Sequence, residues 1–203
     1  MISQEFCFVA VTITLSAVDY ICLMAYDFHG DWDGVTGHMT SLYAPRNARG
    51  MEVTHNVHYA VNFWLQGGCP REKLVLGLAA YGRSYTLQNA QYTGLGEATD
   101  GPGRPGPHSG EAGTLAFYEV CSTIKHGGKV VWLEKQKVPF FVNGDQWVAY
   151  EDLRSIHIKS QYIRDMNLAG AMIWDISLDD FTGVFCGLGR FPLLTTIKKS
   201  LGP

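Results

Sequence analysis

Residues 23–32 read LMAYDFHGDW, an apolar run that ends abruptly in a phenol, a carboxylate, an imidazole and an indole. The run that leads into it, residues 17–24, is apolar apart from Asp19, which favours a parallel strand buried on both faces. In a parallel α/β barrel, polar groups that follow a strand lie on the catalytic face. The stretch therefore predicts either such a site or an ordinary strand followed by an aromatic loop.

Two later segments repeat this pattern. Residues 73–80 (KLVLGLAA) predict a second buried strand that opens into YGRSY, and residues 169–174 (AGAMIW) predict a third that opens into DISLDD. Residues 56–65 have the apolar spacing of a helix and are followed by Gly67 and Gly68 as a stop signal. A strand, a helix and a second strand in this order predict a parallel sheet with a right-handed crossover.

The segment from about residue 81 to residue 150 has a different character. It consists of short β-prone runs and turns, which predict a separate small α+β unit with one helix over residues 116–124. Further helices are predicted over residues 153–166 and 192–201, with Pro192 suited to the first turn of the last one.

The motifs MAYD at residues 24–27, YGRSYTL at 81–87 and GAMIWDISLDDF at 170–181 resemble those of glycoside hydrolase family 18. The similarity is greatest to the animal chitinases and chitinase-like lectins. AFYEVC at 116–121 and WVAYED at 147–152 follow in the same order, and the resemblance runs from about residue 17 to the C-terminus. It implies an α/β fold, a partial TIM (β/α)8 barrel that contains the last three strands, with a small α+β insertion domain.

Length also suggests part of a barrel, because a closed eight-stranded barrel typically needs about 250 residues and this chain has 203, insertion included. We expect the C-terminal half of a larger domain. The expected division is a non-family segment at 1–16, strands six and seven at 17–80, the insertion at 81–150, and helix seven, strand eight and helix eight at 151–203. Within the first segment, residues 6–15 are too short to span a bilayer and follow no basic region. A functional signal peptide, a β-prone strand and a gene-model or splicing artefact all remain open.

The resemblance implies chitin or a chitooligosaccharide as the ligand, and hydrolysis in which the substrate's own N-acetyl group attacks the anomeric carbon. Tyr26 would hydrogen-bond that acetamido group, as the catalytic candidate. The implied substrate-binding residues are Met24, Asp27, Trp32, Tyr81, Arg83, Glu111 and Trp174. Asp179 and Asp180 are expected to cap the turn after the third strand instead. One departure is Ala79-Ala80, where relatives usually have Pro-Thr.

Members that hydrolyse chitin carry Asp-x-x-Asp-x-Asp-x-Glu, whose last residue donates the proton, and no such octet occurs in the 203 residues. The resemblance therefore implies a chitin-binding fragment of a chitinase-like protein that does not hydrolyse chitin alone. A non-catalytic lectin is one alternative. Another is an inert product that does not fold alone, since half a barrel leaves two unpaired edges that invite self-association.

Composition excludes several other classes. A formal charge of −3 and 46% hydrophobic residues describe an ordinary soluble chain, and the scattered basic residues predict no nucleic-acid partner. Residues 101–106 fit a dinucleotide fingerprint by letter, but two of the intervening residues are prolines and no strand or helix flanks them. No zinc-type spacing occurs, and His55 and His58 are expected to face solvent. We expect no cofactor, no metal and no membrane association, and the resemblance implies secretion.

Five cysteines are an odd number for a secreted protein. The resemblance implies a disulfide between Cys121 and Cys186, and in a reducing compartment both would instead be buried thiols. Cys22 is expected to be a small buried hydrophobic residue of the first strand. Cys7 and Cys69 have no informative pattern.

Overall fold

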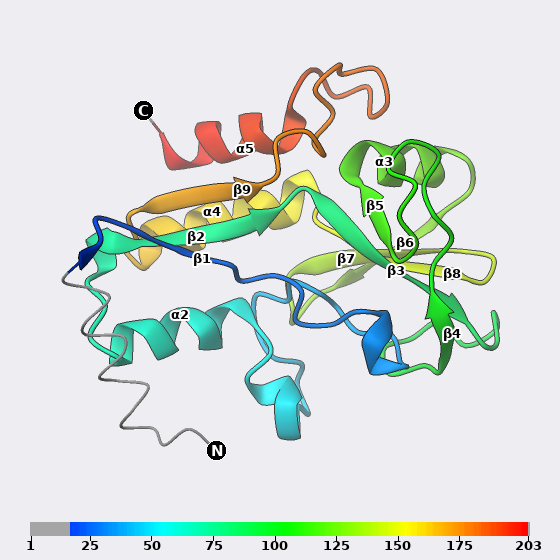
Figure 1. The fold of residues 1–203 in the computed structure, drawn as a ribbon, viewed down its shortest axis with the longest axis horizontal. Coiled ribbons are helices and arrows are strands. Elements are labelled where there is room, and N and C mark those ends of the chain that lie inside the picture. The colour runs from blue at the N-terminus through cyan, green and yellow to red at the C-terminus, as the bar shows by residue number, and fades with distance from the viewer. Residues whose placement is uncertain (1–16, 203) are drawn as a thin grey trace.

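The computed structural model describes residues 17–202. Its first sheet is parallel and has the strand order β1 (Ile21–Leu23), β2 (Leu74–Ala79), β9 (Gly170–Trp174). Helix α2 (Val57–Gln66) connects β1 to β2, so the predicted strand–helix–strand unit is confirmed (Figure 1). α2 begins where the sequence predicts because the Asn56 side chain caps it, accepting a hydrogen bond from the Tyr59 backbone N–H.

Two further helices pack against each other beside this sheet, α4 (Leu153–Asp165) and α5 (Pro192–Leu201) (Figure 1). α4 starts with a reciprocal cap in which the Asp152 carboxylate accepts the Ser155 N–H and the Ser155 hydroxyl accepts the Asp152 N–H. Pro192 occupies the first turn of α5, as predicted. These local signals explain why both helices lie where the sequence predicts them.

The second sheet is antiparallel and is built from the segment between β2 and α4. Its order is β4-β3-β8-β7-β6, with the short β5 also paired to β3. The bounds are β3 (Tyr81–Leu87), β4 (Thr99–Pro102), β5 (Thr114–Ala116), β6 (Lys129–Leu133), β7 (Val138–Asn143) and β8 (Gln146–Ala149). Helix α3 (Phe117–Lys125) confirms the helix predicted near 116–124. Short 3-10 helices are η1 (Asp31–Asp33), η2 (Gly50–Val53) and η3 (Arg71–Lys73).

The antiparallel sheet has its own aromatic core, in which Trp147 is fully buried against Tyr85 and Phe140. Only Ala80 separates β2 from β3, so the chain passes directly from the parallel sheet into the antiparallel one. This continuity fixes Tyr81 and Arg83 of β3 close to the carboxyl ends of the parallel strands.

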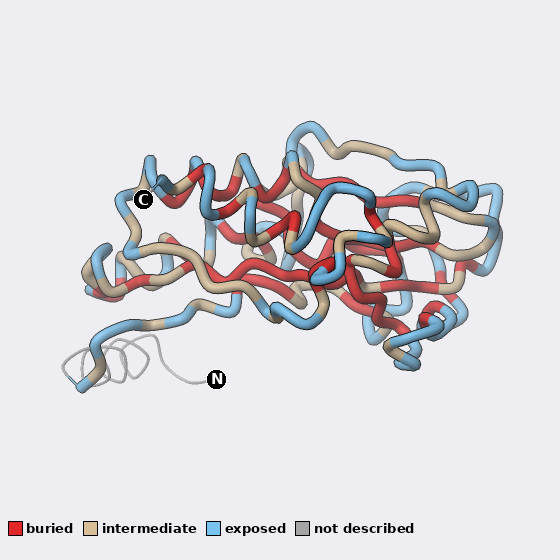
Figure 2. The backbone as a smooth tube through the Cα atoms, turned by 90° about the horizontal axis from the view of Figure 1, so that it is seen from above, coloured by how far each residue is buried: buried red, intermediate tan, exposed pale blue. Residues whose placement is uncertain are grey.

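The first strand differs from its prediction. β1 has three residues, and its neighbours Tyr20 and Met24 are 63% and 69% exposed. Figure 2 shows the first described stretch of the chain in the colours of exposed and intermediate residues. Burial on both faces was predicted, and this is wrong because β1 pairs only with β2 among the described residues. Cys22 is exposed, so the prediction of a small buried hydrophobic residue is also wrong. Cys7 lies outside the described residues, and Cys69 is a buried free thiol.

Several links fix the loops around the two sheets. The predicted disulfide between Cys121 and Cys186 is confirmed and joins α3 to the segment before α5. The Asp179 carboxylate accepts backbone N–H groups at the start of α5, and Asp180 accepts those of Gly183 and Cys186. Both aspartates are fully buried, and these bonds confirm that Asp180 caps the turn after the third strand, whereas Asp179 caps the start of α5.

Lys159 of α4 forms a buried ion pair with Glu151, just before α4, and also donates a hydrogen bond to the loop after η1. Lys159 contacts the Glu151 carboxylate and the Thr40 backbone carbonyl, and the side chains of Lys159 and Glu151 are each 1% exposed. Removing one partner of such a pair leaves an uncompensated buried charge. This contact therefore holds the 38–42 segment against the body of the molecule.

Candidate functional site

The carboxyl ends of the three parallel strands meet at one edge of the first sheet. Leu23 of β1 is paired with Leu76 of β2, and Ala79 of β2 is paired with Trp174 of β9. Tyr26 and Tyr81 follow β1 and β2, and their rings meet edge to face with centroids 6.1 Å apart. The Trp174 carbonyl accepts the Ala80 N–H at 2.8 Å, next to Tyr81. Three predicted site residues therefore belong to one edge of the sheet.

Trp174 is presented to solvent. Although it ends a strand, 55% of its surface is exposed, so it is not a core residue of the described structure. Met24 is likewise exposed and lies just beyond β1. The exposed side chains of Trp174 and Met24 give this edge of the sheet an apolar surface. The hydroxyl groups of the buried Tyr26 and Tyr81 are the polar atoms of the same edge.

The base of the site is an ion pair between Asp27 and Arg83. The guanidinium donates two hydrogen bonds to the carboxylate, Nε to Oδ1 at 2.8 Å and Nη2 to Oδ2 at 2.9 Å. A third bond runs from Nη1 to the Thr114 hydroxyl at 2.8 Å. Asp27 adopts a left-handed backbone conformation, with φ of 58°. The hydrogen bonds to Asp27 raise the pKa of Arg83, while its burial opposes this shift.

Arg83 also connects the site to two other predicted residues. Its guanidinium carbon lies 5.3 Å from the centre of the Trp32 ring and 5.3 Å from that of Tyr81. Trp32 is 58% exposed above it. The charge of the exposed Glu111 also contributes, as the smallest of the causes, to the raised pKa of Arg83. Arg83 of β3 therefore contacts residues of three other segments: Asp27 after β1, Trp32 of η1 and Thr114 of β5.

Both tyrosine hydroxyls of the site are held in their protonated, hydrogen-bond-donating form. Burial raises the pKa of Tyr26, and the charge of Asp27 raises it further. Burial and the Asp27 carboxylate likewise raise the pKa of Tyr81. The Tyr26 hydroxyl is buried and has no hydrogen-bond partner among the described residues. A buried donor without a partner is costly, and a bound acceptor would relieve that cost.

Two residues that support the site were not predicted from the sequence. Thr114 holds one arm of Arg83. Glu119 is 1% exposed, and its carboxylate accepts four hydrogen bonds, from the backbone of His108, Ser109 and Ala116 and from the Ser109 hydroxyl. Glu119 thereby fixes the loop that carries Glu111. Its position three residues after Ala116, at the start of a predicted helix, was the available signal.

The two histidines expected to face solvent differ from each other. His58 is exposed and contacts the Tyr162 hydroxyl at 3.0 Å. His55 is half-buried between other rings, stacked on Phe28 at 6.3 Å, so the expectation is wrong for His55. Within residues 17–202, no three His, Cys, Asp or Glu side chains are grouped so that they could hold a metal ion. Over the same residues, no helix has the length and apolar character needed to cross a membrane.

The model of the family "Glycosyl hydrolases family 18" matches residues 7–179. The chain belongs to glycosyl hydrolase family 18. The match begins inside the segment expected to lie outside the family, and residues 7–16 are outside the described part of this family-18 chain. The division into segments at 17–80, 81–150 and 151–203 stays a prediction.

Curated relatives of this family-18 chain include both chitinase-like proteins and enzymes. It is 44% identical over 187 residues to human Chitinase-3-like protein 2, covering 91% of this chain and 47% of the relative. It is 42% identical over 185 residues to mouse Chitotriosidase-1, covering 91% of this chain and 39% of the relative. The chain thus spans less than half the length of these two relatives.

Solved structures give the same result. A crystal structure of YKL-39 in the presence of chitooligosaccharides superposes with a TM-score of 0.92 at 44% identity, covering 95% of this chain and 53% of that one. Catalytic domain 2 of the Group II chitinase of Ostrinia furnacalis superposes with a TM-score of 0.91 at 38% identity, covering 98% and 52%. The family-18 chain therefore has an α/β fold that corresponds to part of these chitinase domains.

Proposed function

We propose that this chain binds chitooligosaccharides, oligomers of β-1,4-linked N-acetylglucosamine, at the edge where Tyr26, Tyr81 and Trp174 meet. The proposal rests on the edge-to-face contact of the Tyr26 and Tyr81 rings, beside the Asp27–Arg83 ion pair, at the sheet edge where Trp174 ends β9. The YKL-39 neighbour is described as a pseudo-chitinase with retained chitooligosaccharide binding properties, which supports the same ligand class here.

Each side chain has a role that its chemistry suits. The unpartnered Tyr26 hydroxyl donates to the acetamido oxygen of one sugar. The exposed indole of Trp174 forms a flat apolar floor under the same sugar, and Trp32 provides a second platform on the leaving-group side. The remaining contacts come from Met24, Asp27, Tyr81, Arg83 and Glu111. Because Asp27 and Arg83 bind each other in two hydrogen bonds, they orient neighbouring groups as well as line the site.

Calorimetric titration with chitotetraose tests the binding. We expect a saturable heat, and an affinity lowered roughly tenfold by Trp174→Ala, because burying an aromatic face is worth about 1.5–3 kcal/mol. Trp132→Ala is the matched control. Trp132 lies on β6, and the centre of its ring is 3.8 Å from the guanidinium carbon of Arg154. No saturable heat, or equal losses in the two variants, would refute the proposal.

We further propose that the chain alone does not hydrolyse chitin. A positioned acid typically contributes 10²- to 10⁴-fold in rate, and the 203 residues lack the octet that carries the family's proton donor. Turnover of a fluorogenic chitobioside by the pure protein, abolished by Tyr26→Phe, would contradict this. Reading the transcript upstream of Met1 separates the two parents: an in-frame Asp-x-x-Asp-x-Asp-x-Glu identifies a chitinase, and its replacement identifies a lectin.

An extracellular location is part of the same proposal. The Cys121–Cys186 disulfide is the kind of bond that persists in oxidising compartments. Detection of the processed protein in culture medium, with these two cysteines protected from alkylation, is the expected result. Retention in cells with both thiols alkylated is the contrary one.

A further inference from the structure

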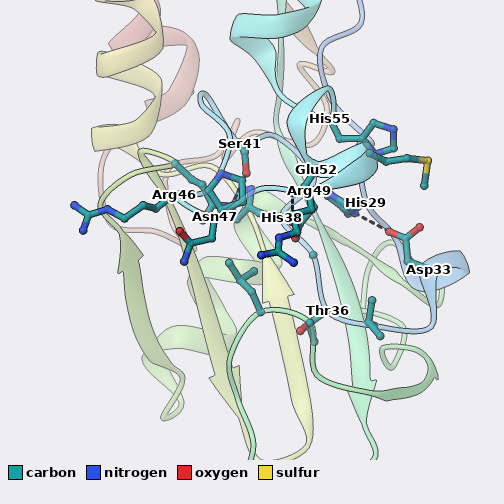
Figure 3. A pocket seen from close by; sticks show the side chains of 17 residues that line it. His29, Asp33, Thr36, His38, Ser41, Arg46, Asn47, Arg49, Glu52 and His55 are labelled. Carbon is teal, nitrogen blue, oxygen red and sulfur yellow. Dashed lines mark hydrogen bonds and ion pairs between the residues drawn. The ribbon is translucent and has the colours of Figure 1, made fainter.

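A second cavity has a volume of about 680 Å³. Figure 3 shows the side chains that line it. It opens between the segment around η2 and the loop at Leu95 and Gly96, and its volume is in the range of small-molecule sites. None of the eight predicted sugar-site residues lines it. The η1 helix separates the two sites, because Trp32 covers Arg83 whereas its neighbour Asp33 faces the cavity.

Part of the lining is apolar and exposed. Val35 and Leu95 are 39% and 38% exposed, and Met51 and Pro45 complete this part of the wall. Such a surface favours a ligand with an apolar body, which gains free energy when it covers these side chains.

Most polar groups of the wall are already paired within the protein. His38 uses both ring nitrogens, contacting the Pro139 carbonyl at 2.8 Å and accepting the Thr40 N–H at 3.2 Å. The Ser41 hydroxyl accepts the Gln136 amide at 2.9 Å. A ligand body that lies against these residues therefore needs no hydrogen bonds of its own.

Three exposed donor side chains line the cavity without a hydrogen bond or ion pair among the described residues, namely those of Arg46, Asn47 and Arg49. In Figure 3 the Arg49 guanidinium extends toward the middle of the space, whereas Arg46 extends away from it. The Nδ1 atom of His55, another lining residue, is buried without a partner.

The charges of Arg49 and Glu52, which both line the cavity, determine which anion could bind there. Glu52 also lines the cavity, and its carboxylate accepts the Arg49 backbone N–H at 3.2 Å. One guanidinium fork fits a planar monoanion through two parallel hydrogen bonds. The nearby negative charge of Glu52 opposes a dianion such as phosphate.

We propose that this cavity is a second binding site that takes a small monocarboxylate with an apolar or aromatic body. The carboxylate binds the Arg49 fork beside the Asn47 amide. The body covers Val35, Leu95 and Met51. The site operates independently of the sugar site, because the two share no residue.

Titration of the whole 203-residue chain with 2-naphthoate and with its neutral isostere 2-naphthamide tests this assignment. We expect saturable naphthoate binding at least about tenfold tighter than naphthamide, as hydrogen bonds to a charged group allow. Arg49→Met should abolish this difference and leave naphthamide affinity and chitotetraose binding unchanged. Arg190→Met, an exposed arginine outside the cavity, is the matched control and should change nothing.

A second variant fills the cavity. Leu95→Trp should block both naphthoate and naphthamide while chitotetraose binding persists. Inorganic phosphate should not compete with naphthoate. Equal affinity for the two naphthalenes, an unchanged difference in Arg49→Met, phosphate competition or no saturable binding would each overturn the assignment.

Discussion

Arg83 connects Asp27, Trp32 and Thr114 to its own strand β3, in which Tyr81 lies two residues earlier. Arg83→Met keeps much of the stem but leaves the half-buried Asp27 carboxylate unpaired. We expect a loss of about 2 kcal/mol in the free energy of unfolding, less than for a fully buried pair because Asp27 is partly hydrated. Urea unfolding measures the loss.

Arg104→Met is the control for that experiment. Arg104 pairs with Asp145 at 2.7 Å, but their side chains are 66% and 36% exposed. A surface pair is worth about 0–1 kcal/mol. Equal losses in the two variants would show that the Asp27–Arg83 pair has no special place in the structure.

His38 makes the stability of the protein depend on pH. Burial lowers its pKa to about 3, and the charge of Lys159 adds to this effect. The unfolded imidazole titrates near 6.5, so between pH 6.5 and 3 the unfolded state binds a proton that the folded state does not. Stability is therefore full above pH 6.5 and falls as the pH decreases toward 3.

The expected loss from this one group between pH 8 and pH 5 is about 2 kcal/mol. Urea unfolding at both pH values measures it. His38→Gln removes the titrating group, so its loss over the same interval should be smaller by about that amount. An identical pH dependence in both proteins would mean that His38 is not the responsible group.

The sequence indicated some residues of the site but not the contacts between them. The family resemblance implied Tyr26, Tyr81 and Trp174, and each lies at or near the carboxyl end of a parallel strand, where such strands meet at one edge. The Asp27–Arg83 contact was not predicted, because it joins positions 56 residues apart and no local pattern encodes it. His55 was misjudged for the same reason, since Phe28 and His29 cover it from a distant segment.

At the scale of elements, the Cys121–Cys186 disulfide closes a loop with a sequence separation of 65. Replacing both cysteines by alanine should lower the free energy of unfolding by about 4 kcal/mol on the chain-entropy model. Thermal unfolding of the double variant under non-reducing conditions checks this. If the oxidised parent and the variant unfold at the same temperature, the bridge does not stabilise this fold.

Helices α2, α4 and α5 were predictable because their starts depend on nearby residues, namely Asn56, the Asp152–Ser155 cap and Pro192. The length and burial of β1 were not. Burial of a strand depends on which strands lie beside it, and β1 has one neighbour among the described residues. Sequence periodicity reports a strand's preference for burial and cannot report whether a partner is present.

At the scale of the whole molecule, the parallel sheet has β1 and β9 as its outer strands, and Tyr20, Cys22 and Met24 are exposed along the first. Exposed edges pair readily with other chains. With reductant present, we expect the light-scattering mass to rise above the 22.5 kDa of one chain as concentration increases. Cys22→Lys should suppress the rise, and a constant mass for the unaltered chain would contradict the prediction.

The claim on which the account depends is that Trp32 and Trp174 frame one sugar-binding surface. The chain has five tryptophans, at 32, 64, 132, 147 and 174, so 5-fluorotryptophan labelling gives one ¹⁹F signal for each. Titration of the labelled protein with chitotetraose should shift the signals of Trp32 and Trp174 saturably and with one affinity, and leave those of Trp64, Trp132 and Trp147 in place. Unchanged signals at 32 and 174, or shifts confined to the other three, would contradict it.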